Sequence, residues 1–300
     1  MKASLEDMKL FLRIVEVGSL RQVAIEYMAE PSTISRRLSA LEKRLKVKLI
    51  ERSKVQSVPT AAGKAYYERL RLLLGQIDNL EREISDSANT PTGLLRVSCP
   101  VDFGALYVAP WLQDLRQTYP ELSVELLLND QRVNLVEEGI DVALRIGQLP
   151  DSALRARSLG TMGVALVGSK SYFEKHGIPE TPQDLAEHHF VLYNWLHKPT
   201  SITLQRGERV EKVHMTSNFS ANNVGAIMNV VKQGGGLHYA PKWFLHKEGN
   251  PSELVEVLKD WQKPTFPLNA LYLAPTTSLV PAKIRVFIDL LMKNIKDIVI

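Results

Sequence analysis

The sequence predicts a multi-domain protein of the α + α/β class, with a small helical head, a long linker helix and a larger α/β body. Short amphipathic helical patterns and two short strand patterns fill residues 1–60. A heptad repeat of apolar residues follows, and from about residue 93 strand patterns alternate with helical ones, as in α/β folds. Three hundred residues are enough for about two domains, each able to bury a core.

The head begins with two short helices whose starts are marked by capping patterns. Ser4-Leu5-Glu6-Asp7 predicts the start of the first helix, which Gly18 ends, and Ser19-Leu20-Arg21-Gln22 predicts the start of the second. Helical spacing predicts that the first helix packs through Leu5, Met8, Phe11, Leu12 and Val15. In the second helix, the residues expected to be buried are Leu20, Val23, Ala24 and Met28.

A third helix, opened by Pro31, separates an apolar face from a polar one. Proline suits the first helical turn, because its missing N–H costs nothing there. At about 100° per residue, the apolar face contains Ile34, Leu38, Leu41 and Leu45. The polar face carries Ser32, Arg36, Ser39 and Lys43, with Thr33 and Ser35 on its flanks. Small hydroxyls and an arginine that reaches a guanine edge or a phosphate suit a DNA major groove; the alternative is an ordinary solvated helix.

A wing and an uneven charge distribution favour the DNA interpretation. Residues 46–60 read as two short strands around a polar tip, which makes the head a winged helix-turn-helix. Residues 1–65 contain 13 Lys and Arg against 7 Asp and Glu, a charge of +6, whereas the whole chain is +4, so residues 66–300 carry −2. A basic head on a slightly acidic body is typical of a modular nucleic-acid binder; a basic surface without a partner is the alternative.

The linker helix is expected from about residue 61 to 87, with Thr60 as its cap. Its apolar positions, spaced 4, 3, 4, 3 and 4, are Tyr66, Leu70, Leu73, Ile77, Leu80 and Ile84. An exposed helix of this length cannot bury such a heptad stripe alone, so we expect it to pair with the same helix of a second subunit. The alternative is that the stripe packs on the chain's own body.

The body reads as strands alternating with helices. Expected strands cover 94–98, 122–128, 140–146, 162–167, 190–193, 236–240 and 267–273. Expected helices cover 104–119, 133–138, 169–176, 222–233 and 281–295, and a hairpin turns near Arg206 and Gly207. This alternation predicts a mostly parallel sheet flanked by helices. Because about 200 residues are many for one such sheet, we expect two lobes.

Several other classes of protein are disfavoured. No apolar run reaches the ~18 residues of a membrane helix, and residues 1–7 lack the apolar segment of a secretion signal, so we expect a cytoplasmic protein that does not bind membranes. The single cysteine, Cys99, excludes an intrachain disulfide. The histidines lack metal-ligand spacing, the glycines 234–236 follow a helix instead of opening one, and there is no nucleophile elbow or convincing carboxylate pair. We therefore expect no cofactor, no metal and no enzymatic activity.

A series of short motifs runs through nearly the whole chain. The head contributes Leu5-x-x-Met8-x-x-Phe11-x-x-x-Val15-Glu16-x-Gly18-Ser19, Ser32-x-x-Ser35-Arg36-x-x-x-x-Leu41-Glu42-x-x-Leu45 and Thr60-x-Ala62-Gly63. The body contributes Gly93-Leu94-Leu95-Arg96-Val97, Tyr119-Pro120, Glu138-Gly139-Ile140-Asp141-Val142-Ala143-Leu144-Arg145-Ile146-Gly147 and Pro182-x-Asp184-Leu185. Together, in this order and spacing, they resemble the LysR-type transcriptional regulators.

This resemblance implies a winged helix-turn-helix DNA-binding domain over 1–60, a dimerising linker helix over 61–89 and an effector-binding regulatory domain over 90–300. The regulatory domain would have two lobes, like periplasmic binding proteins: lobe I over about 93–161 and 270–300, and lobe II over about 166–264. Implied partners are double-stranded promoter DNA, a small-molecule effector and further copies of the chain in a homodimer or homotetramer. RNA polymerase is a candidate partner.

The resemblance also implies which residues contact DNA. The candidates are Pro31, Ser32, Thr33, Ser35, Arg36, Arg52 and Lys54. Arg52 is expected at a phosphate or in an ion pair within the domain, and Arg37 in a structural role. The chain departs from the family pattern at Glu30, where a small polar residue is usual, at Lys46, where glycine is usual, and at Val55, where arginine is common.

Four segments are implied to line the effector site between the lobes. Their residues are Ser98, Cys99, Pro100, Val101, Phe103, Arg145, Ile146, Tyr193, Asn194, Ser220, Ala221 and Asn222. Because a helix amino end and an arginine favour anions, we expect a small anionic effector. Cys99 is either a redox-active thiol or, as for most lone cysteines, a packing group. A solute-binding protein would need an export signal and no basic head, and a two-lobed enzyme would need converging catalytic groups, so the regulator is the favoured interpretation.

Overall fold

The computed structural model describes residues 4–52, 57–85, 90–131, 133–149, 155–193, 201–273 and 280–298. The chain forms two compact units, Met1–Asp86 and Ser87–Ile300. Within the described ranges, no helix combines the length and the apolar character needed to cross a membrane.

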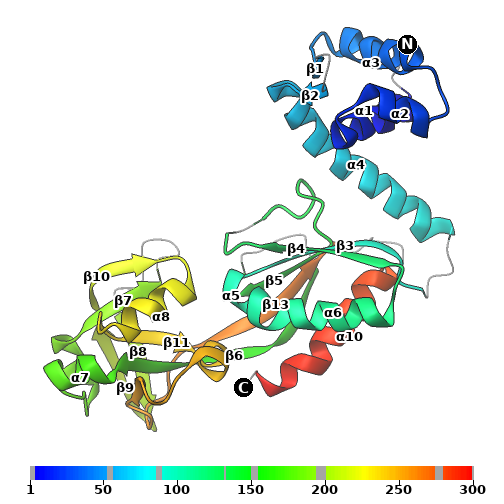
Figure 1. Cartoon of the computed structure of the whole chain (residues 1–300). Helices are drawn as coiled ribbons and strands as arrows, with labels where there is room; N and C mark the ends of the chain where they lie inside the picture. The colour runs from blue at the N-terminus through cyan, green and yellow to red at the C-terminus, as the bar shows by residue number, and fades with distance from the viewer. Residues whose placement is uncertain are drawn as a thin grey trace. The chain divides into compact units, whose positions relative to one another are not determined.

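The first unit is a winged helix-turn-helix followed by a long helix (Figure 1). Its elements are α1 (Leu5–Val17), α2 (Leu20–Glu26), α3 (Pro31–Leu45), β1 (Ile50–Arg52), β2 (Ser57–Pro59) and α4 (Ala61–Ser85). The predicted caps are confirmed, because the hydroxyls of Ser4 and Ser19 accept from the N–H groups of Asp7 and Gln22. Gly18 ends α1 in the left-handed conformation, with a φ of 68°.

The core of the first unit differs in part from the predicted one. It is built from Leu10, Phe11, Ile14, Val23, Ala24, Ile34, Leu38, Leu41, Leu49, Ile50, Leu70 and Leu74. Leu5 is 38% exposed and Met28 is 97% exposed, so their expected burial is wrong. Since α2 ends at Glu26 and Met28 has a φ of 48°, the helical spacing that predicted its burial no longer applies there. The apolar face of α3 is confirmed.

The start of α4 is fastened to the wing. The Thr60 hydroxyl accepts from Gly63 N–H at 2.9 Å and donates to the Lys48 carbonyl at 2.8 Å. The predicted heptad stripe is divided. Leu70 packs into the first unit's own core, whereas Leu73 is 56% and Ile77 is 36% exposed. The side chains of Leu80 and Ile84 lie outside the described residues.

The second unit is built around a seven-stranded sheet. Its strands are β3 (Gly93–Cys99), β4 (Leu122–Leu128), β5 (Val142–Ile146), β6 (Arg155–Ser169), β11 (His238–Pro241), β12 (Leu254–Val257) and β13 (Thr265–Tyr272). The expected mostly parallel sheet is wrong. Strand β3 pairs in parallel with β4 and β5, but β13 runs antiparallel to β5 and β6, and β11 and β12 run antiparallel to β6.

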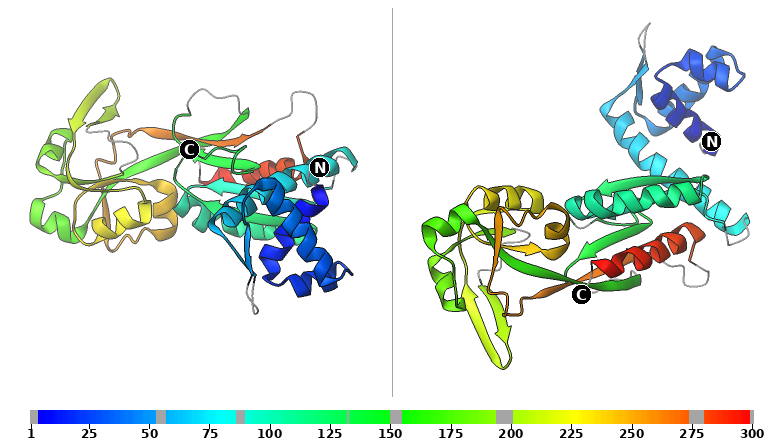
Figure 2. Two further views of the ribbon diagram at one scale, coloured as in Figure 1. Left: turned by 90° about the horizontal axis from the view of Figure 1, so that it is seen from above. Right: turned by 60° about the horizontal axis from the view of Figure 1, so that its bottom comes forward.

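The sheet joins two lobes, which lie toward opposite ends of β6 and β13 (Figures 1 and 2). Lobe I contains β3, β4 and β5 with α5 (Val101–Phe103), a π-helical turn η1 (Gly104–Val108), α6 (Ala109–Thr118), α10 (Ala282–Asn294) and η3 (Ile295–Asp297). Lobe II contains β7 (His189–Tyr193), β8 (Ser201–Arg206), β9 (Arg209–His214), β10 (Thr216–Ala221), β11 and β12, with α7 (Lys170–His176), η2 (Pro182–Glu187), α8 (Val224–Lys232) and α9 (Lys242–Glu248). Strand β6 leaves lobe I and β13 returns to it, so these two strands run in opposite directions, which explains their antiparallel pairing.

The helix expected over 133–138 is absent from this described segment, which forms turns instead. The Asn134 side chain accepts from the N–H groups of Val136 and Glu137, and Gly139 has a φ of 62°. An asparagine that bonds its own following backbone favours a turn over a helix, and the left-handed glycine ends that turn.

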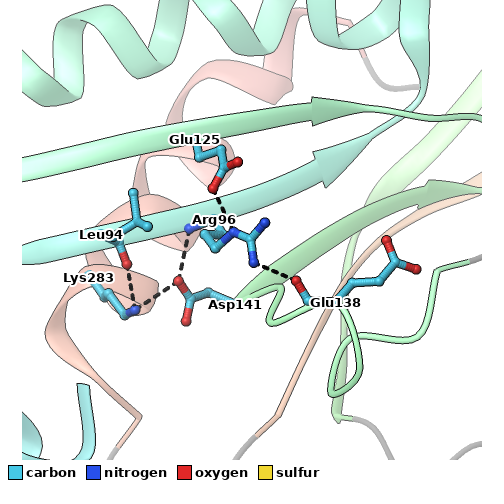
Figure 3. A network of polar contacts seen from close by, with 6 residues as sticks. All are labelled: Leu94, Arg96, Glu125, Glu138, Asp141 and Lys283. Atoms are coloured by element: carbon cyan, nitrogen blue, oxygen red, sulfur yellow. Dashed lines mark hydrogen bonds and ion pairs between the residues drawn. The ribbon is translucent and has the colours of Figure 1, made fainter. Parts of the chain in front are cut away.

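A buried polar network holds lobe I together (Figure 3). Lys283 of α10, only 6% exposed, donates to the Leu94 carbonyl at 2.7 Å and to Asp141 Oδ2 at 2.8 Å. The same Asp141 oxygen accepts from Arg96 N–H at 2.9 Å. The Arg96 guanidinium reaches Glu125 at 2.7 Å. Four segments distant in sequence are thereby joined, and the Arg96 and Asp141 of the sequence motifs have a structural role.

Candidate DNA-binding and effector-binding sites

The polar face of α3 is presented to solvent as predicted. Ser32, Arg36, Ser39 and Lys43 are exposed, and Thr33 and Ser35 are half-buried at its flanks. Arg36 folds back along the helix, since its Nε donates to the Ser32 carbonyl at 3.3 Å and its Nη2 to the Ser32 hydroxyl at 3.4 Å. Pro31 is exposed in the first turn. This face offers hydroxyl donors and acceptors beside a guanidinium.

Glu42 fixes the wing to α3. Its side chain is 3% exposed, and Oε1 accepts from the N–H groups of Leu49 at 2.9 Å and Ile50 at 3.2 Å. Oε2 accepts from Lys48 Nζ at 2.9 Å. Burial by itself raises the pKa of Glu42, but these hydrogen bonds outweigh it and the pKa lies below its usual value. The sequence placed Glu42 in a motif without showing this role.

The other basic residues of the first unit that the sequence singled out have different surroundings. Arg37 forms an ion pair with Asp7 at 2.7 Å, which confirms its structural role. The backbone of Arg52 ends β1, but its side chain lies outside the described residues, as does Lys54 at the wing tip. Lys46 ends α3 in the left-handed conformation, with a φ of 55°, where a glycine would be less strained.

Arg145 is the charged group of the candidate effector site. It lies on β5, and its guanidinium donates to the Ser98 hydroxyl at 2.9 Å and to the carbonyls of Gln131 at 3.2 Å and Leu144 at 2.7 Å. Burial lowers its pKa from the usual value. Two of the predicted segments, the end of β3 and the end of β5, therefore meet through Arg145 and Ser98.

Asp130 lies near this arginine, and Asp102 lies near Asp130. Asp130 accepts from Val101 N–H at 3.1 Å. Burial raises the pKa of Asp130 and the nearby Asp102 raises it further, although the Val101 N–H and Arg145 act against both effects. Burial also raises the pKa of the half-buried Tyr193, with Asp130 and Asp102 adding to the shift. The candidate site thus has the Asp130 carboxylate near the Arg145 guanidinium.

The amino end of α8, where the sequence suggested an anion, is bound to a carboxylate of the chain itself. Asp102 Oδ2 accepts from Gly225 N–H at 3.1 Å and from Asn223 Nδ2 at 2.9 Å. The Asn223 Oδ1 in turn accepts from Ala226 N–H at 2.8 Å and caps the helix. Ser220, Ala221 and Asn222 precede this cap, and Ser220 and Asn222 are exposed.

Other predicted residues face the core. Cys99 and Phe103 are 0% exposed and belong to the main hydrophobic cluster. Burial raises the pKa of the Cys99 thiol to about 12, which keeps it protonated and unreactive. Pro100, Val101 and Ile146 are half-buried at the same end of the sheet, and Asn194 lies outside the described residues.

Sequence reasoning missed Asp102, Asp130, Gln131 and Asn223. An asparagine directly before an apolar helix signals an N-cap, so Asn223 could have been found. Asp102 could not, because its partners are 121 and 123 residues away. Among the described residues there is no cluster of three His, Cys, Asp or Glu suited to a metal.

Two family models match the chain. Residues 5–64 match a bacterial regulatory helix-turn-helix protein of the lysR family, and residues 88–296 match a LysR substrate binding domain. One matched range lies in each structural unit, and residues 65–87, which include most of α4, lie between the two ranges.

Relatives and solved structures agree with these matches. The chain is 31% identical to the HTH-type transcriptional activator AaeR of Escherichia coli strain K12, over 95% of the chain and 92% of that protein. It is 27% identical to the full-length virulence activator AphB of Vibrio cholerae, with a TM-score of 0.61 and coverage of 97% and 99%. CrgA of Neisseria meningitidis gives 26% identity and a TM-score of 0.61, with coverage of 98% and 100%.

Proposed function

Because the chain belongs to the LysR family of bacterial transcriptional regulators, we propose that it binds promoter DNA sequence-specifically and responds to a small anionic effector between its lobes. Proteins of this family are regulators rather than enzymes, and they combine DNA binding with effector binding and oligomer formation. The finer assignments below are specific to this chain.

The exposed face of α3 is the observation that carries the proposal. Its apolar side packs into the core, and Glu42 holds the wing next to it, so the exposed polar side can enter a major groove as a rigid unit. We assign base or nearby phosphate contacts to Pro31, Ser32, Thr33, Ser35 and Arg36, and phosphate or minor-groove contacts to Arg52 and Lys54.

Pairing through α4 follows from its exposed apolar residues. Leu73 and Ile77 are exposed on the described part of the helix. In a homodimer this surface would be covered, and two heads would read an interrupted inverted repeat; a homotetramer would join two such pairs. We assign 1–60 to DNA binding, 61–89 to dimerisation and 90–300 to regulation.

The effector is assigned to the segment where β3 and β5 end. Arg145 supplies a positive charge, and the Ser98 hydroxyl lies at 2.9 Å from its guanidinium. A small carboxylate would accept hydrogen bonds from the Arg145 guanidinium in place of the Ser98 hydroxyl and the Gln131 carbonyl. Pro100, Val101, Ile146, Tyr193, Asn194, Ser220, Ala221 and Asn222 complete the assigned set, while Cys99 and Phe103 support it from the core. We place the protein in the cytoplasm, where promoters and RNA polymerase are.

Selection of genomic DNA by the purified full-length chain tests the proposal. Recovered fragments should share an interrupted inverted repeat, and binding should weaken steeply as salt rises, because phosphate contacts release counterions. Recovery of fragments without a common sequence would contradict specific recognition. Genes next to the recovered sites give candidate effectors, and isothermal titration calorimetry with anionic against neutral analogues tests the charge assignment.

A further inference from the structure

Asp102 connects the two lobes. It lies on α5 of lobe I, and its carboxylate accepts from Asn223 Nδ2 at 2.9 Å and from Gly225 N–H at 3.1 Å, both at the amino end of α8 in lobe II. A carboxylate at this end of a helix is favoured by the helix dipole, and hydrogen bonds to an ionised group are stronger than neutral ones. The contact is close, since a Cβ added at Gly225 would lie 3.0 Å from Asp102 Oδ1.

The rest of the described lobe junction near α5 is mostly aromatic. Phe103 meets Trp243 of α9 edge to face, with ring centroids 5.3 Å apart. The Tyr107 hydroxyl donates to the Trp243 carbonyl at 2.7 Å. The aromatic contacts are not directional, and the Tyr107 hydrogen bond joins neutral groups, whereas the Asp102 carboxylate accepts from two defined donors. The contacts of Asp102 therefore stabilise this arrangement of the lobes relative to others in which they are absent.

A short series of contacts leads from the candidate effector site to Asp102. Arg145 donates to the Gln131 carbonyl, and the neighbouring Asp130 accepts from Val101 N–H. Val101 is covalently joined to Asp102. A ligand that draws Arg145 away from Gln131, or moves residues 129–131, therefore acts on the segment that carries Asp102.

We propose that the Asp102 carboxylate is a latch between the lobes, and that its release from α8 transmits effector binding to the arrangement of the lobes. This inference rests on the function proposed above. It assigns a positioning role to Asp102, which acts through α8 and does not itself need to touch the effector.

Spin-label distances between the lobes test the latch directly. Cys99 is 0% exposed, so cysteines introduced at the exposed Gln117 of α6 and Lys175 of α7 can be labelled selectively in the full-length chain. Labelled chains are diluted with unlabelled ones, so that distances within one chain dominate. We expect one distance population in the parent protein and a second or shifted population in Asp102→Ala and in Asn223→Ala.

Asp114→Ala is the matched control, because Asp114 is an exposed carboxylate on α6 of the same lobe. It should leave the distance distribution unchanged. If Asp102→Ala fails to fold, Asp102→Asn replaces it, since the amide keeps the shape but loses the charge. A distribution identical to that of the parent protein in both Asp102→Asn and Asn223→Ala would overturn the latch.

The promoter affinity measured without effector shows whether Asp102 has a signalling role or only a structural one. On a fragment recovered with the wild-type chain, Asp102→Ala should change the affinity for DNA by about fivefold or more. This is the size of a typical coupling between two sites. A shifted lobe distance with unchanged promoter binding would overturn the signalling role. If the wild-type chain selects no promoter DNA, the proposed function fails, whereas the latch is still judged by the distances.

Discussion

Replacement of Glu42 by alanine is expected to loosen the wing and much of the first unit. The change removes the acceptor of two backbone N–H groups whose residues, Leu49 and Ile50, are 1% and 3% exposed. A buried donor left without a partner costs about 1–3 kcal/mol, so the two together cost about 2–6 kcal/mol. The ion pair with Lys48 adds little, because the lysine side chain is 73% exposed.

Amide exchange is the appropriate assay for Glu42. All four tryptophans lie beyond residue 110, so tryptophan fluorescence does not report on the first unit. A loss of 2 kcal/mol corresponds to roughly 30-fold faster exchange in peptides that cover 46–52. Glu51→Ala, at an exposed site of β1, is the matched control and should exchange as the parent protein does. Unchanged exchange in Glu42→Ala would refute the argument from buried donors.

The pH dependence provides an independent check on the same residue. Because the pKa of folded Glu42 is below its usual value, the ionised form stabilises the fold. This contribution is fully present above the unfolded pKa of about 4.5 and is lost as pH falls from there through the lower folded pKa. Glu42→Gln should lack that part of the acid sensitivity. A variant with the same acid dependence as the parent protein would show that other carboxylates carry it.

Two further substitutions and one labelling experiment have expected outcomes. Lys46→Gly should stabilise the first unit by up to about 1 kcal/mol, measured by amide exchange, because the site has a left-handed φ of 55°; a destabilised variant would contradict this. Gly63→Ala should strongly destabilise the same unit, since a Cβ there would lie 2.0 Å from the Leu49 carbonyl oxygen, and wild-type exchange would refute the clash. Cys99 should react with a thiol reagent only after unfolding, because the thiol is buried and its pKa is raised to about 12; rapid labelling of the native protein at pH 8 would contradict this.

Local signals in the sequence predicted the first unit well. The caps at Ser4, Ser19 and Thr60 and the apolar face of α3 depend on residues a few positions apart, and the structure confirms them. Met28 shows the limit of this reasoning, because a helical spacing was extended past the last residue of α2. A periodic pattern does not show where the helix that produces it ends.

Contacts between distant segments could not be predicted in the same way. Strand alternation indicated an α/β body but not the antiparallel pairing of β13 with β5 and β6, which depends on the path of the chain between the lobes. The amino end of α8 was predicted to attract an anion, and in the structure the Asp102 carboxylate accepts a hydrogen bond there. The sequence indicated the chemistry of that end but not the partner, which lies more than a hundred residues away.

Titration of a selected promoter fragment with Arg36→Ala tests most directly whether the polar face of α3 contacts DNA. Loss of the Arg36 contact should weaken binding by about 1–3 kcal/mol, or roughly 5- to 150-fold. Arg116→Ala, which removes an exposed arginine from the second unit, should bind as the wild-type chain does. Equal affinity of a folded Arg36→Ala variant and the wild-type chain would contradict the assignment of this face to DNA.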